Sequence, residues 1–195
     1  MAQPRRLLLG STSKYRKALL ERLGLAFEVA APGVDEQALP AERPADTALR
    51  LAVLKATALK ERFADALIIG SDQVAALGSE RLDKPGCHDN AVRQLRRLSG
   101  RTADFHTAVA LLDAKSGKLD SKVVPCRVTF RALDDARIEA YLRHEQPYDC
   151  AGSAKAEGLG IALIARMETD DPTSLIGLPL IALTDMLENA GLPIL

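Results

Sequence analysis

The sequence predicts an α/β protein with a mixed sheet, and two observations lead to that fold class. Through the first half of the chain, short apolar runs bounded by turn residues alternate with segments of helical periodicity. In the middle of the chain, the turn-forming residues 115–118 separate two further apolar runs, as in a β-hairpin. Alternation favours parallel strands joined by helices, whereas a hairpin joins antiparallel strands, so both strand directions are expected in one sheet.

Six short apolar runs are predicted to form the strands. Each has the length of a buried strand, and polar or turn-forming residues bound most of them. They are residues 5–9, 27–31, 67–70, 107–112, 123–130 and 160–165.

Five helices are predicted from apolar residues that recur at helical spacing. The first apolar stripe runs from Tyr15 to Leu23, and Gly24 is placed to end that helix. The next three stripes fall within residues 48–59, 91–98 and 138–142. In the last helix, Pro179 is expected in the first turn and Gly191 just beyond the end, the positions that these two residues favour.

Length and composition indicate a single soluble domain over residues 1–195. With 47% hydrophobic residues, the chain can bury a core large enough to fold alone. Because it carries 26 cationic and 26 anionic side chains, nonspecific binding of nucleic acid is not expected. Three unpaired cysteines and the lack of a long apolar segment favour a cytoplasmic protein that does not cross a membrane. The oligomeric state stays open, a homodimer included.

The segment GSTSKYRK, residues 10–17, is a candidate phosphate site. It follows the first predicted strand and opens the first predicted helix, where unpaired backbone N–H groups and the helix dipole attract anions. Ser11, Ser13 and Arg16 could add hydroxyl and guanidinium contacts to phosphate oxygens. The simpler interpretation is that Ser13 only caps the helix while the cations face water.

A second strand end carries Asp72, in LIIGSDQV at residues 67–74. A carboxylate at such a position can hold a divalent cation or take a proton from water, although a turn-forming aspartate is the simpler interpretation. Glu36, Lys55 and Lys84 are each typical of a solvated charge when taken alone. Together these four residues match a phosphoryl-transfer site, with cations for phosphate oxygens, carboxylates for Mg²⁺ and a base for water.

Read in order, these segments resemble the Maf family of nucleotide pyrophosphatases over essentially the whole chain. The matching segments are Ser11 to Arg16, Val34-Asp35-Glu36, Lys55, Gly70-Ser71-Asp72-Gln73, Lys84-Pro85, residues 151–158 and Gly177-Leu178-Pro179. The resemblance implies the Maf/ITPase-like fold: an elongated, twisted mixed sheet flanked by helices, in two lobes with a nucleotide in the cleft between them.

Within the family, three residues resemble the branch that hydrolyses 7-methyl-GTP: Tyr15, Gln73 and Glu157. The resemblance implies that they set base specificity. A methylated guanine is cationic, so an aromatic face and a carboxylate would both favour it. The branch commonly has Trp in place of Tyr15 and Pro in place of Lys14, and a simpler interpretation packs Tyr15 on the apolar stripe of its helix.

The implied reaction is hydrolysis of a nucleoside triphosphate to its monophosphate and pyrophosphate with Mg²⁺ or Mn²⁺. Ser11, Ser13, Arg16 and Lys55 are expected to bind phosphates, Asp72 and Lys84 to act in catalysis, and Glu36 and Asp72 to hold the metal. Two alternatives stay open: a dTTP and UTP pyrophosphatase of the same fold, and a nucleotide-binding regulator of cell division without turnover. The enzyme is favoured over the regulator, because a protein that only binds has no need of a base beside a metal site.

Overall fold

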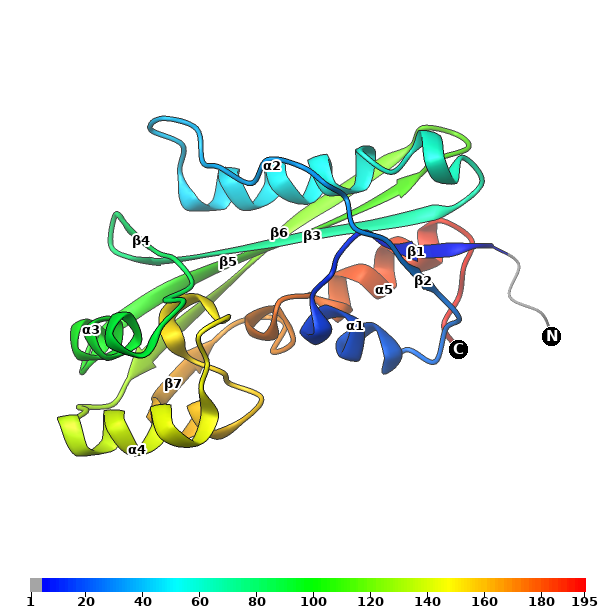
Figure 1. Cartoon of the computed structure of the whole chain (residues 1–195). Coiled ribbons are helices and arrows are strands. Elements are labelled where there is room, and N and C mark those ends of the chain that lie inside the picture. The colour runs from blue at the N-terminus through cyan, green and yellow to red at the C-terminus, as the bar shows by residue number, and fades with distance from the viewer. Residues whose placement is uncertain (1–4) are drawn as a thin grey trace. The chain divides into compact units, whose positions relative to one another are not determined.

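A computed structural model describes residues 5–195 and contains a seven-stranded mixed sheet (Figure 1). The strands are β1 (Leu7–Leu9), β2 (Glu28–Val29), β3 (Leu67–Leu77), β4 (Glu80–Leu82), β5 (Thr102–Asp113), β6 (Leu119–Phe130) and β7 (Ile164–Glu168). Their order is β2-β1-β3-β5-β6-β7, and β4 pairs with β3. Strand β1 is parallel to β2 and β3, whereas β4 is antiparallel to β3 and β7 to β6, which confirms the expected mixed sheet.

Residues 5–195 also form five α-helices and four short 3₁₀ helices, of which η4 and α5 follow the last strand. The α-helices are α1 (Lys14–Glu21), α2 (Pro44–Thr57), α3 (His88–Leu98), α4 (Asp135–Glu145) and α5 (Leu180–Asn189). The 3₁₀ helices are η1 (Glu61–Phe63), η2 (Ala151–Ser153), η3 (Leu159–Leu163) and η4 (Ser174–Ile176). Within residues 5–195, no helix is long and apolar enough to cross a membrane.

The chain divides into two compact units, each built from separate stretches of sequence. The first unit holds the described residues up to Gln73, with Thr107–Val124 and Asp171–Leu195. The second holds Val74–His106 and Pro125–Asp170. Strands β3, β5 and β6 supply residues to both units.

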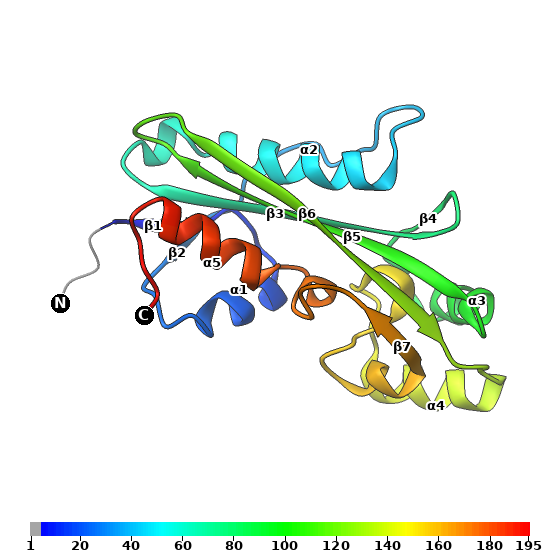
Figure 2. The same cartoon turned by 180° about the vertical axis from the view of Figure 1, so that it is seen from behind.

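The first unit is layered, with helices on both faces of its strands. Helices α1 and α5 lie side by side on one face, and α2 covers the other (Figures 1 and 2). Side chains alternate between the two faces of a strand, so Leu7 and Leu9 of β1 join one core with Leu19 of α1 and Leu183 of α5. Both ends of the described chain therefore contribute to the same core.

Helix α2 approaches β3 closely at Gly70. A Cβ atom at Gly70 would lie 2.0 Å from the backbone oxygen of Ala52 and 2.8 Å from the backbone nitrogen of Ala56. No side chain larger than hydrogen fits there, and this contact brings Lys55 of α2 above the continuation of β3, where Asp72 lies.

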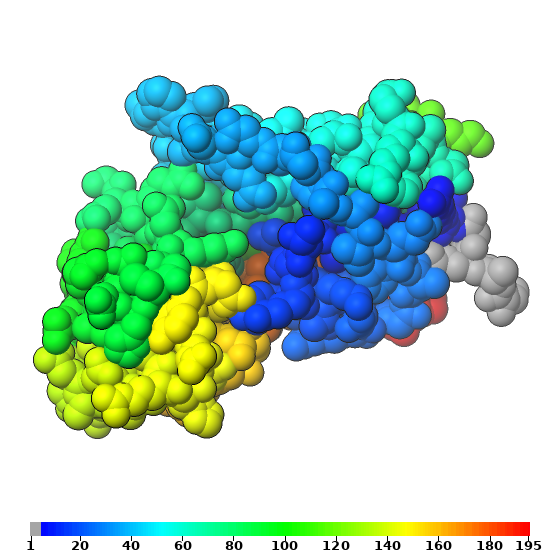
Figure 3. Space-filling view, viewed as in Figure 1, coloured from blue at the N-terminus to red at the C-terminus, as the bar shows by residue number. Residues whose placement is uncertain are grey.

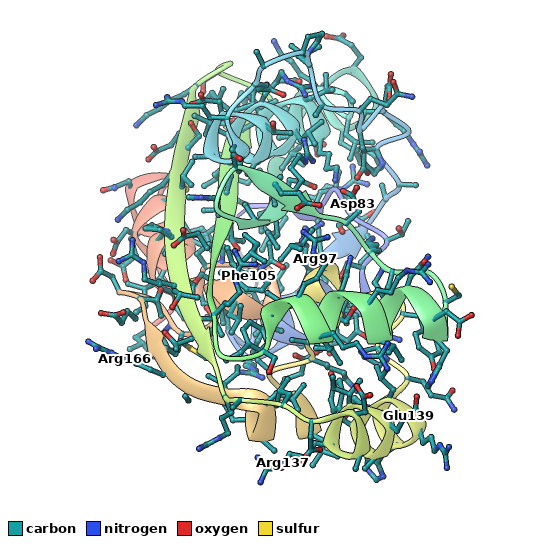
Figure 4. The ribbon with its side chains drawn as sticks, turned by 90° about the vertical axis from the view of Figure 1, so that its left-hand side faces the viewer. Asp83, Arg97, Phe105, Arg137, Glu139 and Arg166 are labelled. Carbon is teal, nitrogen blue, oxygen red and sulfur yellow. The ribbon has the colours of Figure 1, made fainter. Side chains whose placement is uncertain are left out.

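In the second unit, α3 packs against α4 and η2, and α4 packs against η3. Figure 4 shows the two helices next to each other, with Glu139 on α4 and Phe105 on β5. Gly152 lies against the Phe105 ring, since a Cβ atom there would be 3.2 Å from Cζ. Its φ of 69° belongs to the left-handed region that favours glycine.

Most of the elements expected from the sequence are confirmed. All five helices are present, Ser13 caps α1, and Gly24 and Gly191 adopt positive φ just after α1 and α5. Pro179 is the N-cap residue of α5 instead of lying in its first turn. The hairpin is closed by a hydrogen bond from the Asp113 N–H to the Lys118 carbonyl, 2.9 Å long.

The strand expected at residues 160–165 is wrong in its first four residues. Residues 159–163 form η3, and β7 begins only at Ile164. The chain folds back so tightly here that a Cβ atom at Gly160 would lie 2.5 Å from the Lys155 carbonyl oxygen. Apolar character alone does not distinguish such a buried turn from a short strand.

Candidate functional site

The candidate site residues of the first unit lie beyond the ends of β1 and β2 and in the middle of β3. Leu9 of β1 is in register with Ile69 of β3, and the Gly10 N–H donates to the Ile69 carbonyl at 2.8 Å. Ser11 therefore follows β1 at the level where β3 continues towards Asp72. Polar groups at the carboxyl ends of parallel strands meet at one edge, where α/β proteins commonly bind ligands.

Two serines shape the turn into α1. The Ser13 hydroxyl accepts a hydrogen bond from the Arg16 N–H at 3.4 Å, so the helix-capping interpretation of Ser13 is confirmed. Ser11 is buried, and its hydroxyl oxygen accepts from the Ser13 N–H at 3.1 Å and from Nη1 of Arg16 at 3.4 Å. Phosphate binding by the two serines stays a prediction.

Arg16 is oriented by a backbone carbonyl near the far end of the chain. Its Nε donates to the Gly177 carbonyl at 2.9 Å, and the buried Ser71 hydroxyl lies within donor distance of the same oxygen at 2.9 Å and of the Ala108 carbonyl at 2.7 Å. Burial lowers the pKa of Arg16, while the nearby carboxylates of Asp72 and Glu36 act in the opposite direction. The hydrogen bond to the Gly177 carbonyl thus fixes the orientation of the guanidinium within the protein itself.

Lys55 is buried between two carboxylates. Its Nζ lies 2.7 Å from Oδ1 of Asp72 and 3.0 Å from Oε1 of Glu36. Lys55 is 3% exposed and Asp72 is 7% exposed, whereas Glu36 lies on the segment between β2 and α2 that runs over the surface (Figure 3). A buried ammonium needs such partners because desolvation would otherwise neutralise it.

The two carboxylates suit a hard cation that binds together with phosphate. Among residues 5–195, no group of three or more His, Cys, Asp or Glu side chains is placed to hold a metal ion. Mg²⁺ in nucleotide enzymes commonly uses only one or two carboxylates and takes its other ligands from phosphate and water. Glu36 and Asp72, which converge on Lys55, fit that donor set.

Gln73 is engaged within the protein. Its Nε2 lies within donor distance of the Thr107 hydroxyl at 2.9 Å and of the Ser174 and Leu175 carbonyls, both at 3.0 Å. Thr107 itself is fully buried and donates to the Ser174 carbonyl at 2.8 Å. These contacts hold η4 against β3 and β5, and base reading by Gln73 stays a prediction.

Tyr15 is half-buried in the first turn of α1. The Lys14 ammonium lies 4.9 Å from the centre of its ring, a cation–π contact. A cation thus already lies over this ring in the structure.

Lys84 and Glu157 belong to the second unit, and the other predicted site residues belong to the first. Lys84 is exposed after β4, and Glu157 is exposed between η2 and η3. Partial burial of its carboxyl raises the pKa of Glu157, and the carboxylates of Glu145 and Asp149 act in the same direction. The first unit thus brings together Ser11, Ser13, Tyr15, Arg16, Glu36, Lys55, Asp72 and Gln73.

Two residues that orient this group, Ser71 and Thr107, are not among the site residues predicted from the sequence. Ser71 and Thr107 are fully buried hydroxyl residues that border the apolar runs of β3 and β5, and a hydroxyl at the border of a buried run is the signal that could have found them. In the second unit, Nη1 of Arg81 is buried and has no hydrogen-bond partner among the residues that the structure describes. Buried donors without a partner are rare in folded proteins. This one lies three residues before the predicted site residue Lys84.

Known proteins resemble this chain over nearly all of its length. Residues 6–190 match the family model described as Maf-like protein. The chain is 59% identical over 188 residues to a 7-methyl-GTP pyrophosphatase of Cupriavidus pinatubonensis, covering 96% of this chain and 94% of that protein. It is 58% identical over 189 residues to a 7-methyl-GTP pyrophosphatase of Thiobacillus denitrificans, covering 97% and 94%. Because the family model spans nearly all of the described residues, the chain belongs to the Maf-like protein family.

Proposed function

We propose that this protein hydrolyses 7-methyl-GTP to 7-methyl-GMP and pyrophosphate. The observation that carries the proposal is the buried pair of Lys55 and Asp72, joined by the exposed Glu36 carboxylate, beside the oriented guanidinium of Arg16. The relatives named above, 58% and 59% identical over nearly the whole chain, support the same substrate.

The first unit supplies groups for phosphate binding and for proton removal. In this proposal Arg16 and Lys55 bind phosphate oxygens, and the hydroxyls of Ser11 and Ser13 add hydrogen bonds at the start of α1, a role that the contact between Arg16 and Ser11 supports. Asp72 is the general base that takes a proton from the attacking water. Attack at the α-phosphorus expels pyrophosphate, and hydrolysis in ¹⁸O water should place the label in the monophosphate.

Glu36 and Asp72 would hold a Mg²⁺ or Mn²⁺ ion, which supplies charge neutralisation for the phosphates when bound. Lys55 keeps the two carboxylates at one place through its contacts of 2.7 and 3.0 Å. Lys84 is proposed to add a further cation for the phosphate chain.

Base preference is proposed to come from Glu157 and Tyr15. The Glu157 carboxylate can accept hydrogen bonds from the N1 and exocyclic amine of guanine, and it favours a cationic base over a neutral one. Tyr15 offers its ring face to the methylated base, in competition with the Lys14 ammonium that lies over the ring.

The test is pyrophosphate release with Mg²⁺ from 7-methyl-GTP, GTP, dTTP, UTP, CTP and ATP. Wild type is compared with Asp72→Asn and with Asp65→Asn, a change of the same kind at an exposed aspartate. We expect 7-methyl-GTP to be the best substrate and Asp72→Asn to lose at least ~100-fold in kcat, the usual contribution of a general base. Asp65→Asn should match wild type.

Other outcomes separate the alternatives. If dTTP or UTP is the best substrate, the catalytic roles stand and the base assignments of Tyr15 and Glu157 fall. If no nucleotide is hydrolysed while nucleotides still bind, a regulator without turnover becomes the better description. Tyr15→Ala should reduce the preference for 7-methyl-GTP over GTP, and an unchanged preference would remove Tyr15 from base recognition.

A further inference from the structure

The last residue of α4 holds a neighbouring loop through both of its carboxylate oxygens. Oε1 of Glu145 accepts from Nζ of Lys155, and Oε2 accepts from the Leu159 N–H at 2.7 Å. The Glu145 side chain is 10% exposed and that of Lys155 is 28% exposed, so little solvent screens this pair. One buried carboxylate thus connects two points of the loop that lie four residues apart.

A second contact comes from the same helix, one turn earlier. The Tyr141 hydroxyl accepts a hydrogen bond from the Lys155 N–H at 3.0 Å, and Tyr141 is 3% exposed. The Tyr141 phenol is a neutral hydroxyl at physiological pH, and burial raises its pKa further above its ordinary value. Helix α4 therefore binds Lys155 by its backbone as well as by its ammonium.

Two glycines let the loop fit closely around these contacts. A Cβ atom at Gly158 would lie 2.6 Å from Oε2 of Glu145, and one at Gly160 would lie 2.5 Å from the Lys155 carbonyl oxygen. A side chain at Gly160 would collide with backbone, and one at Gly158 would force the Glu145 carboxylate to move. The loop is shaped around the Glu145 carboxylate.

Glu157 lies inside this anchored stretch. Lys155 is fixed two residues before it, and Gly158 and Leu159 are fixed directly after it, whereas the Glu157 side chain itself is exposed. The backbone that carries Glu157 is thus held from both sides.

We propose that Glu145 is a positioning residue for base recognition: it fixes the loop of residues 155–159 so that the Glu157 carboxylate is presented in one position. The inference rests on the proposed function, because it takes Glu157 as the group that reads the base. Glu145 does not touch the substrate and acts only through Glu157. A carboxylate held in place loses less conformational entropy on binding than one on a mobile loop.

The test measures kcat and KM for 7-methyl-GTP and GTP with the full chain carrying Glu145→Gln. The uncharged amide has one acceptor oxygen in place of two, so it can accept from the Lys155 ammonium or from the Leu159 N–H but not from both, and the loop loses one anchor. We expect kcat/KM for 7-methyl-GTP to fall about 10-fold, mainly through KM, the size of one charged hydrogen bond. The value for GTP should fall by less than about 3-fold, since GTP shares the hydrogen bonds to the Glu157 carboxylate but lacks the positive charge that this carboxylate also favours.

Glu139→Gln is the matched control. Glu139 lies on the same helix (Figure 4), but it contacts His88 and Arg143 instead of the loop. This variant should keep the preference of wild type. Thermal unfolding is recorded for every variant, and if Glu145→Gln does not fold, Lys155→Gln breaks the same pair from the other side and is measured in its place.

A double variant separates positioning from a general structural role. If Glu145 acts through Glu157, then Glu145→Gln added to Glu157→Gln causes no further loss of preference. A preference unchanged by Glu145→Gln, or a double variant whose losses multiply, overturns the inference while the proposed function stands. If Glu157→Gln keeps the preference of wild type, the loop does not read the base and the inference falls with that assignment. If wild type itself does not prefer 7-methyl-GTP, the proposed function fails, and the inference with it.

Discussion

Replacing Gly70 with alanine should separate helix α2 from β3 and disturb the site that this contact builds. The new Cβ atom would lie 2.0 Å from the Ala52 oxygen and 2.8 Å from the Ala56 nitrogen, both backbone atoms of α2 that cannot rotate away. Overpacking usually costs ~1–3 kcal/mol, and a collision with backbone places Gly70→Ala near ~3 kcal/mol. For a chain of this length, that corresponds to a fall in Tm of roughly 6–12 °C.

Gly10→Ala is the matched control, since Gly10 follows the neighbouring strand β1. Its Cβ atom would meet Cδ1 of Leu59 at 3.0 Å, the flexible end of a side chain, and two backbone oxygens at 3.2 Å. We expect a loss below ~1 kcal/mol. Thermal unfolding followed by circular dichroism gives both values, and pyrophosphate release should fall in Gly70→Ala, because Lys55 moves with α2. Gly10→Ala serves as a control for stability alone, since it lies in the candidate phosphate segment and contacts the Lys55 backbone oxygen. Equal Tm values for Gly70→Ala and wild type would refute this account of how α2 is placed.

Three further predictions concern charge and thiol chemistry. Lys55→Met should lower the free energy of unfolding in urea by ~3–5 kcal/mol, because it leaves the buried Asp72 carboxylate without its ammonium partner. Lys17→Met removes only a surface pair and should change the free energy of unfolding by less than ~1 kcal/mol. Similar losses in the two variants would contradict the argument from burial. Arg50 lowers the pKa of Glu42 from its ordinary value of 4.5 to about 2, so the stabilisation is present above pH 4.5 and is lost as the pH falls towards 2. The Tm difference between wild type and Glu42→Gln should therefore shrink over that interval, and a constant difference would show that the pair does not titrate as described. Burial raises the pKa of the Cys126 thiol to about 11. At pH 8 a thiol reagent should therefore label the exposed Cys87 rapidly and Cys126 only after unfolding. The variant Cys87→Ser should lack the rapid phase of labelling.

The sequence predicted the helices well because their signals are local. Ser13 caps α1 and Gly24 ends it through contacts within a few residues, and the apolar stripe of each helix records the face that it buries. The mixed sheet followed from the order of those elements. The 3₁₀ helix at residues 159–163 was missed because its conformation depends on Lys155 and Glu145, which lie outside the run itself.

The candidate site could be predicted as a set of residue types but not as an arrangement. Ser11, Lys55 and Asp72 were found from strand ends and motif order, whereas the contacts that orient them are distant in sequence. The Ser71 hydroxyl lies within hydrogen-bond distance of the Gly177 carbonyl, 106 residues away, and Arg16 donates to the same carbonyl from 161 residues away. No window of local sequence contains both partners of such a contact, so only the folded structure reveals the role of Gly177.

The core that joins Leu7 and Leu9 to Leu183 and Leu187 also sets an order of events during synthesis. Residues 74–170, which contain the whole second unit, emerge from the ribosome before α5 exists to cover β1. Until then β1 lacks the packing partner that α5 provides, and Arg16 cannot form its hydrogen bond to the Gly177 carbonyl until Gly177 has been added. The nascent chain therefore completes the contact that orients Arg16 only after the second unit has been synthesised and Gly177 has been added.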